Sequence, residues 1–138
     1  MESTTRRRSD CPISVSLELF GDRWTLLVIR DLMFKDRREF RDFLGAEERV
    51  ASNVLADRLK RLIAAGVVTR APHPDDARRA LYRLTEKGVD LAPVLIEIVL
   101  WAAQHERTSA PADELAQMRE DREALLIAIR RAHLGPSP

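Results

Sequence analysis

The chain has 138 residues, of which 45% are hydrophobic, and helix formers outnumber its seven prolines and five glycines, so we expect one mostly α domain. The net charge is only +1, and the single cysteine excludes an internal disulfide. Because the apolar run VLIEIVLWAA is short and broken by Glu97, and the N-terminus lacks an apolar signal segment, we expect a cytoplasmic protein with no membrane partner.

The N-terminal third predicts an arm and three helices. Residues 1–10, MESTTRRRSD, predict a disordered basic arm, whose Arg6–Arg8 either touch DNA phosphates or keep the tail soluble. CPISVSLELFG predicts a short helix that ends at Gly21, and Asp22 follows as the N-cap of RWTLLVIRDLMF. That segment is apolar nearly all round, which predicts a buried central helix. REFRDFL predicts a further short helix.

The stretch Ala51–Gly66 predicts an amphipathic helix. Its inner face would hold Leu55, Leu59, Leu62 and Ile63, and its outer face Asn53, Asp57, Lys60 and Arg61. Ser52 can cap the first turn, and Gly66 can end the helix in the left-handed conformation. Together with the helix over 38–44 it predicts a helix-turn-helix with a longer connection than usual.

The next segments predict a β-hairpin wing. VVTRAP is followed by the polar turn PHPDDARR and by ALYRLTEKG, in which Ala80, Tyr82 and Leu84 alternate inward. The order helix, strand, turn, strand is that of a winged helix, in which the preceding helix enters a DNA major groove. The predicted fold class is therefore mostly α with a small β-hairpin wing.

The C-terminal third predicts two more helices. Thr85 would cap the first of them, and Pro93 predicts a kink or a late start. After the break at TSAPADE, a last helix is expected from about Ala112 to Ala132. Its apolar stripe must cover either the chain's own core or a second subunit; the stripe comprises Leu115, Met118, Leu125, Leu126 and Ile129.

Charge is concentrated in the middle of the chain. Residues 49–87 contain nine basic and four acidic side chains, whereas the segments on either side are net acidic. A basic middle between acidic ends fits a protein that meets phosphate with one surface and its own kind with another. Because such segregation also arises by chance, it supports a nucleic-acid partner without establishing one.

The chain resembles the HxlR-type winged-helix regulators, through CPISVSLELFGDRWTLLVIRDLMF, RLKRLIAAGVVTR, YRLTEKG, LAPVL and the tryptophan of VLWA. The segment DDARRALYRLTEKG is also similar to the wider MarR superfamily. The resemblance covers roughly residues 11–101 and implies a homodimeric transcription factor, which we expect to be a repressor. Helix and wing of each subunit would then read half of a palindrome, with terminal helices forming the dimer interface.

The resemblance implies DNA-binding residues by position. Ser52 and Asn53 would lie at the start of the recognition helix, near phosphates and base edges. The remaining basic candidates are Arg58, Lys60 and Arg61 on the helix and Arg78 and Arg79 on the wing. For each of them the alternative is a solvated basic side chain.

Three departures from the family pattern stand out. Asp75 lies near the wing tip, where MarR-like proteins often have a basic residue, and Asp76 either aims an arginine or points to solvent. Asp57 lies on the recognition helix and must either accept from a cytosine amino group or be held by Arg58 or Arg61. The helix after Ser109 is longer than the family pattern requires.

Cys11 is a candidate redox sensor. Its Cys-Pro at the start of the first helix matches the family, some of whose members sense oxidants or electrophiles with this thiol, and a helix N-terminus can acidify a thiol. Alternatively the thiol only fills space, as cysteines often do. Without a second cysteine, a switch would need an intersubunit bond, a small-thiol adduct or direct alkylation.

Catalytic function is not indicated. The three histidines are far apart, and neither a Gly-rich phosphate loop nor a nucleophile motif is present, so we expect no catalytic residues, no metal site and no cofactor.

We expect a winged helix-turn-helix domain over 11–106 and a C-terminal dimerisation helix and tail over 107–138. The predicted function is homodimeric binding to double-stranded DNA, with a small molecule or thiol-reactive stress as the candidate signal. The alternative is a winged-helix module that contacts protein or RNA.

Overall fold

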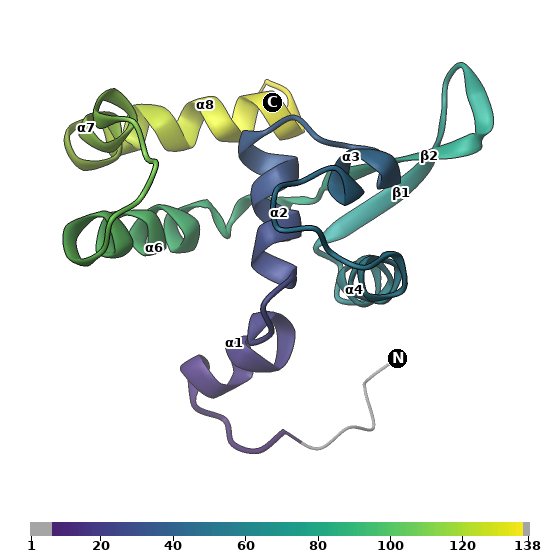
Figure 1. Cartoon of the computed structure of the whole chain (residues 1–138), viewed down its shortest axis with the longest axis horizontal. Coiled ribbons are helices and arrows are strands. Elements are labelled where there is room, and N and C mark those ends of the chain that lie inside the picture. Colours follow the sequence, from purple (N-terminus) through teal and green to yellow (C-terminus); the bar gives the residue numbers. More distant parts are fainter. Residues whose placement is uncertain (1–6, 137–138) are drawn as a thin grey trace.

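The computed structural model describes residues 7–136, so Arg6 of the predicted arm lies outside the described residues. Four helices come first: α1 (Pro12–Phe20), α2 (Thr25–Phe34), α3 (Phe40–Leu44) and α4 (Ser52–Ala64). A hairpin of β1 (Val68–His73) and β2 (Asp76–Leu84) follows. Four more helices complete the chain: α5 (Glu86–Val89), α6 (Ala92–His105), α7 (Ala112–Glu120) and α8 (Arg122–Leu134). The predicted winged helix is thereby confirmed (Figure 1).

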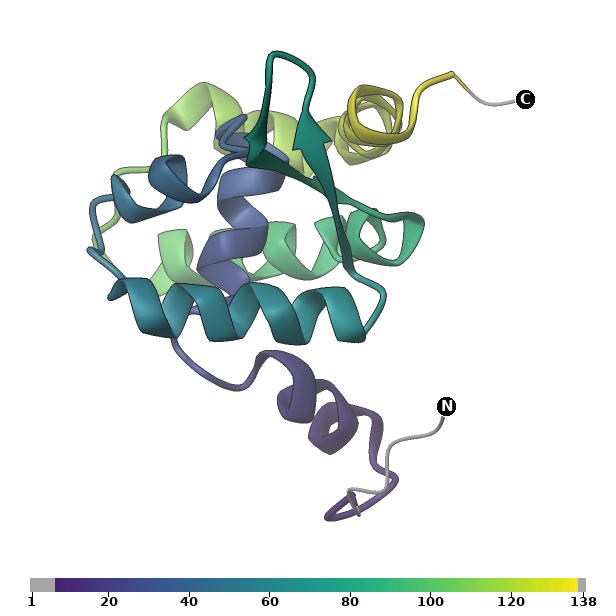
Figure 2. The ribbon, with the colours of Figure 1, turned by 90° about the vertical axis from the view of Figure 1, so that its right-hand side faces the viewer.

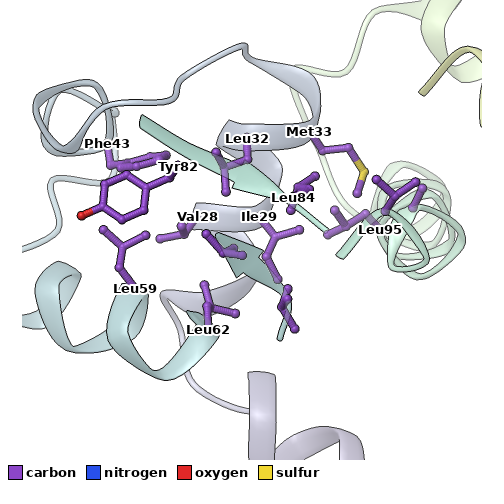
Figure 3. Close-up of a cluster of buried hydrophobic side chains, with 14 of the residues drawn as sticks. Val28, Ile29, Leu32, Met33, Phe43, Leu59, Leu62, Tyr82, Leu84 and Leu95 are labelled. Carbon is purple, nitrogen blue, oxygen red and sulfur yellow. The ribbon is translucent and has the colours of Figure 1, made fainter. Parts of the chain in front are cut away.

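Helix α2 runs through the centre of the molecule, as its apolar composition predicts (Figure 1). The Asp22 carboxylate accepts hydrogen bonds from the backbone N–H of Trp24 and Thr25 at 3.0 and 3.2 Å, which satisfies amides at the start of the helix. Ile29 is fully buried against side chains of α4, β2 and α6 (Figure 3). The rings of Phe43 and Tyr82 pack edge to face with 6.0 Å between centroids, which holds α3 against the wing.

Helix α4 buries Leu55, Leu59 and Leu62, as its period predicts. Two details of the prediction were wrong. Ile63 is 38% exposed, because its position on the helix lies toward the flank of the apolar stripe rather than at its centre. The N-cap is Ala51 and no side chain caps the helix, since Ser52 already belongs to the first turn. Gly66 has a φ of 76° and ends the helix in the left-handed region, as expected.

The wing is an antiparallel hairpin in which Arg70 pairs with Tyr82 and Val68 with Leu84. These pairs share the face that turns toward the core, where Tyr82 and Leu84 are buried. The backbone N–H of Tyr82 donates to the carbonyl of Arg38 at 2.8 Å. The hairpin is thus attached to the segment that leads into α3, and β2 also packs against α2.

Helices α5 and α6 follow the predicted late start. Thr85 Oγ1 accepts from the N–H of Gly88 at 3.2 Å, so α5 has the expected cap. Pro93 lies in the first turn of α6, where a missing N–H costs no helical hydrogen bond. Contrary to the expectation from VLIEIVLWAA alone, the longer run Glu86–His105 meets the length and hydropathy of a membrane span. Core helices meet the same criteria, and α6 buries Leu95 and Ile96 within the fold.

The C-terminal segment differs from the single helix that we predicted, because it breaks at Asp121 into α7 and α8 (Figure 1). Asp121 has φ −134° and ψ 40°, which is not helical, so the chain turns there. The apolar stripe covers the chain's own core: Met118 and Ile129 are buried, and His133 Nε2 lies 3.0 Å from the carbonyl oxygen of Met33. Burial within the chain is thus observed for Met118 and Ile129, and a second subunit as cover for the rest of the stripe stays a prediction.

Candidate nucleic-acid interface

Helix α4 and the wing lie on the same side of the molecule and face the viewer together in Figure 2. The outward face of α4 presents Ser52, Asn53, Asp57 and Lys60, all of which are exposed. The opposite face is anchored by three buried leucines, so these polar side chains are held on a rigid helix. This is the geometry that a recognition helix needs.

Two predicted contact residues of α4 turn sideways instead. Arg58 Nε donates to Asp22 Oδ2 at 2.8 Å, and its side chain is only 20% exposed. Arg61 reaches the backbone carbonyl of Glu18, at the end of α1, over 3.5 Å. Both arginines therefore connect the flank of α4 to α1 and to the segment that follows it.

The Asp22–Arg58 pair is strongly ionised. Partial burial opposes the charge of Asp22, but hydrogen bonds from Thr25, Arg58 and the Trp24 amide together hold the pKa of Asp22 well below its usual range. The same hydrogen bond raises the pKa of Arg58. Asp57, whose partner the sequence left open, accepts from Arg58 at 2.5 Å. A carboxylate on the outward face of α4 is thus partly neutralised within the chain.

At the wing tip, Asp76 holds Arg78. Its carboxylate accepts from the backbone N–H of Arg78 at 3.0 Å and from Arg78 Nε at 3.2 Å. These hydrogen bonds lower the pKa of Asp76. The hydrogen bonds to Asp76 orient the guanidinium of Arg78. Because the side chain is 92% exposed, the guanidinium also stays accessible to solvent. The carboxylate–arginine pairing considered from the sequence is the one observed.

Arg79 pairs with a carboxylate outside the wing, unlike its neighbour Arg78. Its guanidinium makes two parallel hydrogen bonds of 2.7 Å to the carboxylate of Glu39, at the start of α3. This bidentate contact lowers the pKa of Glu39 and raises that of Arg79. Arg79 therefore joins the wing to α3, with a side chain that is 36% exposed.

A groove of about 380 Å³ lies between α3 and the wing and contains four arginines. Two of them, Arg41 and Arg70, were missed by the sequence reasoning. The two-residue period of the strand could have predicted the position of Arg70, because Arg70 lies on the same face of β1 as Val68 and opposite Tyr82. Arg41 carries no such signal, since its position depends on how α3 packs against the hairpin. Only Glu39 is an acidic lining residue of this groove, which leaves it electropositive.

Cys11 lies at the other end of the molecule from the wing, as the residue before α1. It is exposed, and the nearby backbone N–H groups of Ser14 and Ile13 at the start of α1 lower the pKa of its thiol. Arg7 and Arg8 of the predicted arm are exposed on the same segment. The structure does not bring Cys11 together with the wing, and over residues 7–136 no cluster of His, Cys, Asp and Glu suits a metal ion.

Comparison with known proteins gives consistent matches. A family model described as HxlR-like helix-turn-helix matches residues 19–110. The HTH-type transcriptional regulator Rv3095 of Mycobacterium tuberculosis is 36% identical over 90 residues, which cover 65% of this chain and 56% of Rv3095. The chain thus spans little more than half the length of that relative. The HTH-type transcriptional regulator YodB of Bacillus subtilis is 35% identical over 95 residues, covering 68% of this chain and 84% of YodB.

Solved structures show the same relationship. PA1607 superposes with a TM-score of 0.67 at 31% identity, covering 77% of this chain and 72% of PA1607. The reduced form of YodB superposes with a TM-score of 0.57 at 34% identity, covering 70% of this chain and 95% of YodB. YodB structures also exist after diamide treatment and with a quinone bound.

Proposed function

The chain belongs to the HxlR-like helix-turn-helix family of transcriptional regulators, and we propose that it represses transcription by binding a palindromic DNA operator as a homodimer. The observation that carries this proposal is the shared orientation of the α4 outer face and the arginine-bearing wing (Figure 2). A helix in the major groove and a hairpin along the adjacent backbone are the contacts that this arrangement can make.

On α4 we assign different roles to the polar side chains. Asn53 is proposed to read a base edge, since it is exposed and an amide can pair with adenine in a bidentate manner. Lys60 contacts a DNA phosphate. Ser52, in the first turn of α4, donates a hydrogen bond to the DNA backbone. Arg58 and Arg61 act mainly by holding α4 in place, because Arg58 already pairs with Asp22 in the segment after α1 and Arg61 with the Glu18 carbonyl of α1.

On the wing, Arg78 is the proposed DNA contact and Asp76 its positioning residue. Arg79 contributes charge to the groove while Glu39 fixes its orientation. Arg41 and Arg70 extend the positive surface and are proposed to approach a backbone phosphate.

Dimerisation is proposed to use exposed apolar side chains that the single chain leaves uncovered. No residue of α1 is buried, and Ile13 and Leu17 are 73% and 55% exposed. Trp101 on α6 is 63% exposed. Large apolar side chains exposed on helices are candidates for a subunit interface. The stripe of α8 is already used within the chain, and a dimerisation role for the outer surface of 107–138 stays a prediction.

A second proposal concerns the signal. We infer that Cys11 responds to thiol-reactive compounds, because it is exposed at a helix start that favours its thiolate. The similarity to YodB, which has been solved with a quinone bound, supports this choice. Cys11 directly precedes α1, and the end of α1 contacts Arg61 of α4, so a change at the thiol that shifts α1 would also affect the recognition helix.

Footprinting of the purified protein on the DNA that flanks its own gene tests the function. The proposal predicts a protected, palindromic site whose occupancy falls steeply with salt. Binding to RNA or to another protein, with no protected DNA site, would instead identify the chain as an interaction module.

A further inference from the structure

A cavity of about 480 Å³ lies between the DNA-binding fold and the C-terminal helices. Its lining residues come from the α2 region and α6 and from residues 108–111, α7 and α8. The volume lies within the range of small-molecule sites. Because the family match ends at residue 110, α7 and α8 supply a wall that lies beyond the matched family domain.

The lining is largely apolar. Phe34, Ile98, Val99, Met118 and Leu125 contribute side chains from all four helices. Ile98 remains 45% exposed although it lies beside the C-terminal helices. When a ligand covers hydrated apolar surface in a concave site, the free energy of the complex falls, which favours binding.

The charges at the cavity are unequally distributed. Lys35 and Arg30 lie on the α2 wall, and Glu114 lies on the α7 wall. Lys35 is exposed, and within the described part of the chain no carboxylate lies in ion-pair range of its ammonium group. Arg30 is already paired with Asp31 at 2.7 Å and with Glu48 at 2.8 Å.

We propose that this cavity binds a small organic anion with an apolar body. The body lies against α6, α7 and α8, and the anionic group lies at the α2 wall, where Lys35 offers an unused cation. Glu114 on the opposite wall opposes a second negative charge, which restricts the ligand to one anionic end. This site is separate from the DNA-binding face and from Cys11.

Arg30 connects the cavity to α4. Its partner Glu48 lies in the segment just before the recognition helix, so an anion that competes for Arg30 would loosen the contact that holds this segment. This coupling rests on the proposed DNA-binding function, whereas ligand binding itself does not.

Two matched fluorescent probes test the site on the full chain. The first, 8-anilino-1-naphthalenesulfonate, has an apolar body and one sulfonate, and the second, N-phenyl-1-naphthylamine, has nearly the same body without charge. Each is titrated into the wild type, Ala102→Phe, which fills the cavity, and Lys35→Ala, which removes the cation. The controls are Ala128→Phe on the exposed surface of α8 and Lys60→Ala on α4. Circular dichroism verifies folding, and Ser109→Trp at the cavity edge replaces Ala102→Phe if that variant unfolds.

The proposal predicts one bound probe per chain, loss of both probes in the filled variant, and several-fold weaker binding of the sulfonate alone in Lys35→Ala. The site would be overturned if each probe bound the filled variant as tightly as the wild type. It would also be overturned if neither probe bound the wild type. An equal effect of Lys35→Ala on both probes would overturn the anionic ligand. None of these titrations contains DNA, so their failure is distinct from failure of operator binding. The coupling is overturned if a saturating sulfonate probe leaves operator affinity unchanged.

Discussion

At the scale of single residues, ion pairs decide which cations are available to DNA. The helical period of α4 correctly predicted its buried leucines and its outward Asn53 and Lys60. It could not predict that Arg61 reaches α1 and Arg58 the segment after it, because the partner of a flanking side chain depends on where distant segments pack. The same limit explains why Arg41 was missed. Periodicity specifies a face of an element, whereas tertiary packing specifies its partner.

The wing pair Asp76–Arg78 gives a prediction with a definite sign. Asp76→Ala removes a negative charge from a DNA-facing loop, so simple electrostatics predicts tighter binding. If Asp76 positions Arg78, the variant instead binds the operator more weakly, and Arg78→Ala weakens it by a similar amount. Fluorescence anisotropy with one operator measures both variants, with Asp75→Ala as the neighbouring control. Tighter binding of Asp76→Ala would show that its carboxylate is only a repulsive neighbour.

The pair Glu48–Arg30 predicts a pH dependence of stability. The hydrogen bond from Arg30 lowers the pKa of Glu48 from 4.5 to about 2. The folded chain therefore binds fewer protons at this site, and the pair stabilises the fold above pH 4.5 and loses this contribution as pH falls toward 2. Because the carboxylate is partly solvated, Glu48→Gln should lower the free energy of unfolding by about 1 kcal/mol at pH 7.

Urea unfolding of the wild type and Glu48→Gln at a series of pH values checks this prediction. Glu47→Gln is the matched control, since Glu47 is exposed beside Glu48. The difference between the Glu48 variant and the wild type should shrink as the pH falls. A difference that stays constant across this range would mean that the Arg30 contact contributes no pH-dependent stability.

At the scale of elements, the sequence predicted the winged helix because its local signals agree with one another. The alternation in β2, the cap at Thr85 and the left-handed Gly66 each have local causes. The break at Asp121 could not be predicted, because the apolar stripe continues through it and the turn depends on how α7 packs on α6 and α8.

Two isoleucines on α8 distinguish its role in the core from a role in a subunit interface. Ile129 is 6% exposed and lies in the core, whereas Ile127 is 49% exposed. Ile129→Ala should lower the free energy of unfolding by about 2–5 kcal/mol, and Ile127→Ala by much less. Thermal unfolding and sedimentation of both variants measure stability and assembly. A monomer produced by Ile127→Ala alone would place the subunit interface on the outer face of α8.

At the scale of the whole molecule, function is distributed over separate surfaces. The DNA-facing side holds α4, the wing and the arginine groove, while α1 extends away from the body (Figures 1 and 2). The distribution of charge along the sequence indicated a basic middle, and the fold brings α4 and the wing from that segment onto one side of the molecule. The ligand cavity could not be predicted from the sequence, because its walls come from segments far apart in the chain.

The exposed surface of α1 gives the prediction for assembly. Leu17→Arg places a charge in the proposed subunit interface, so the variant should sediment as a monomer and lose affinity for a palindrome more than for a single half-site. Ile127→Arg on α8 is the control with the same change in chemistry. An unchanged dimer in Leu17→Arg would exclude the exposed face of α1 as the interface.

Operator discrimination by Asn53→Ala tests the central claim most directly. The affinity of the wild type and the variant is measured for the footprinted operator and for a scrambled duplex over a range of salt concentrations, with Arg119→Ala on α7 as the control. If α4 reads bases, Asn53→Ala lowers the operator preference by about 1–3 kcal/mol and leaves the salt dependence unchanged, while Lys60→Ala reduces the salt slope by about one. If both variants bind both duplexes like the wild type, α4 does not face DNA.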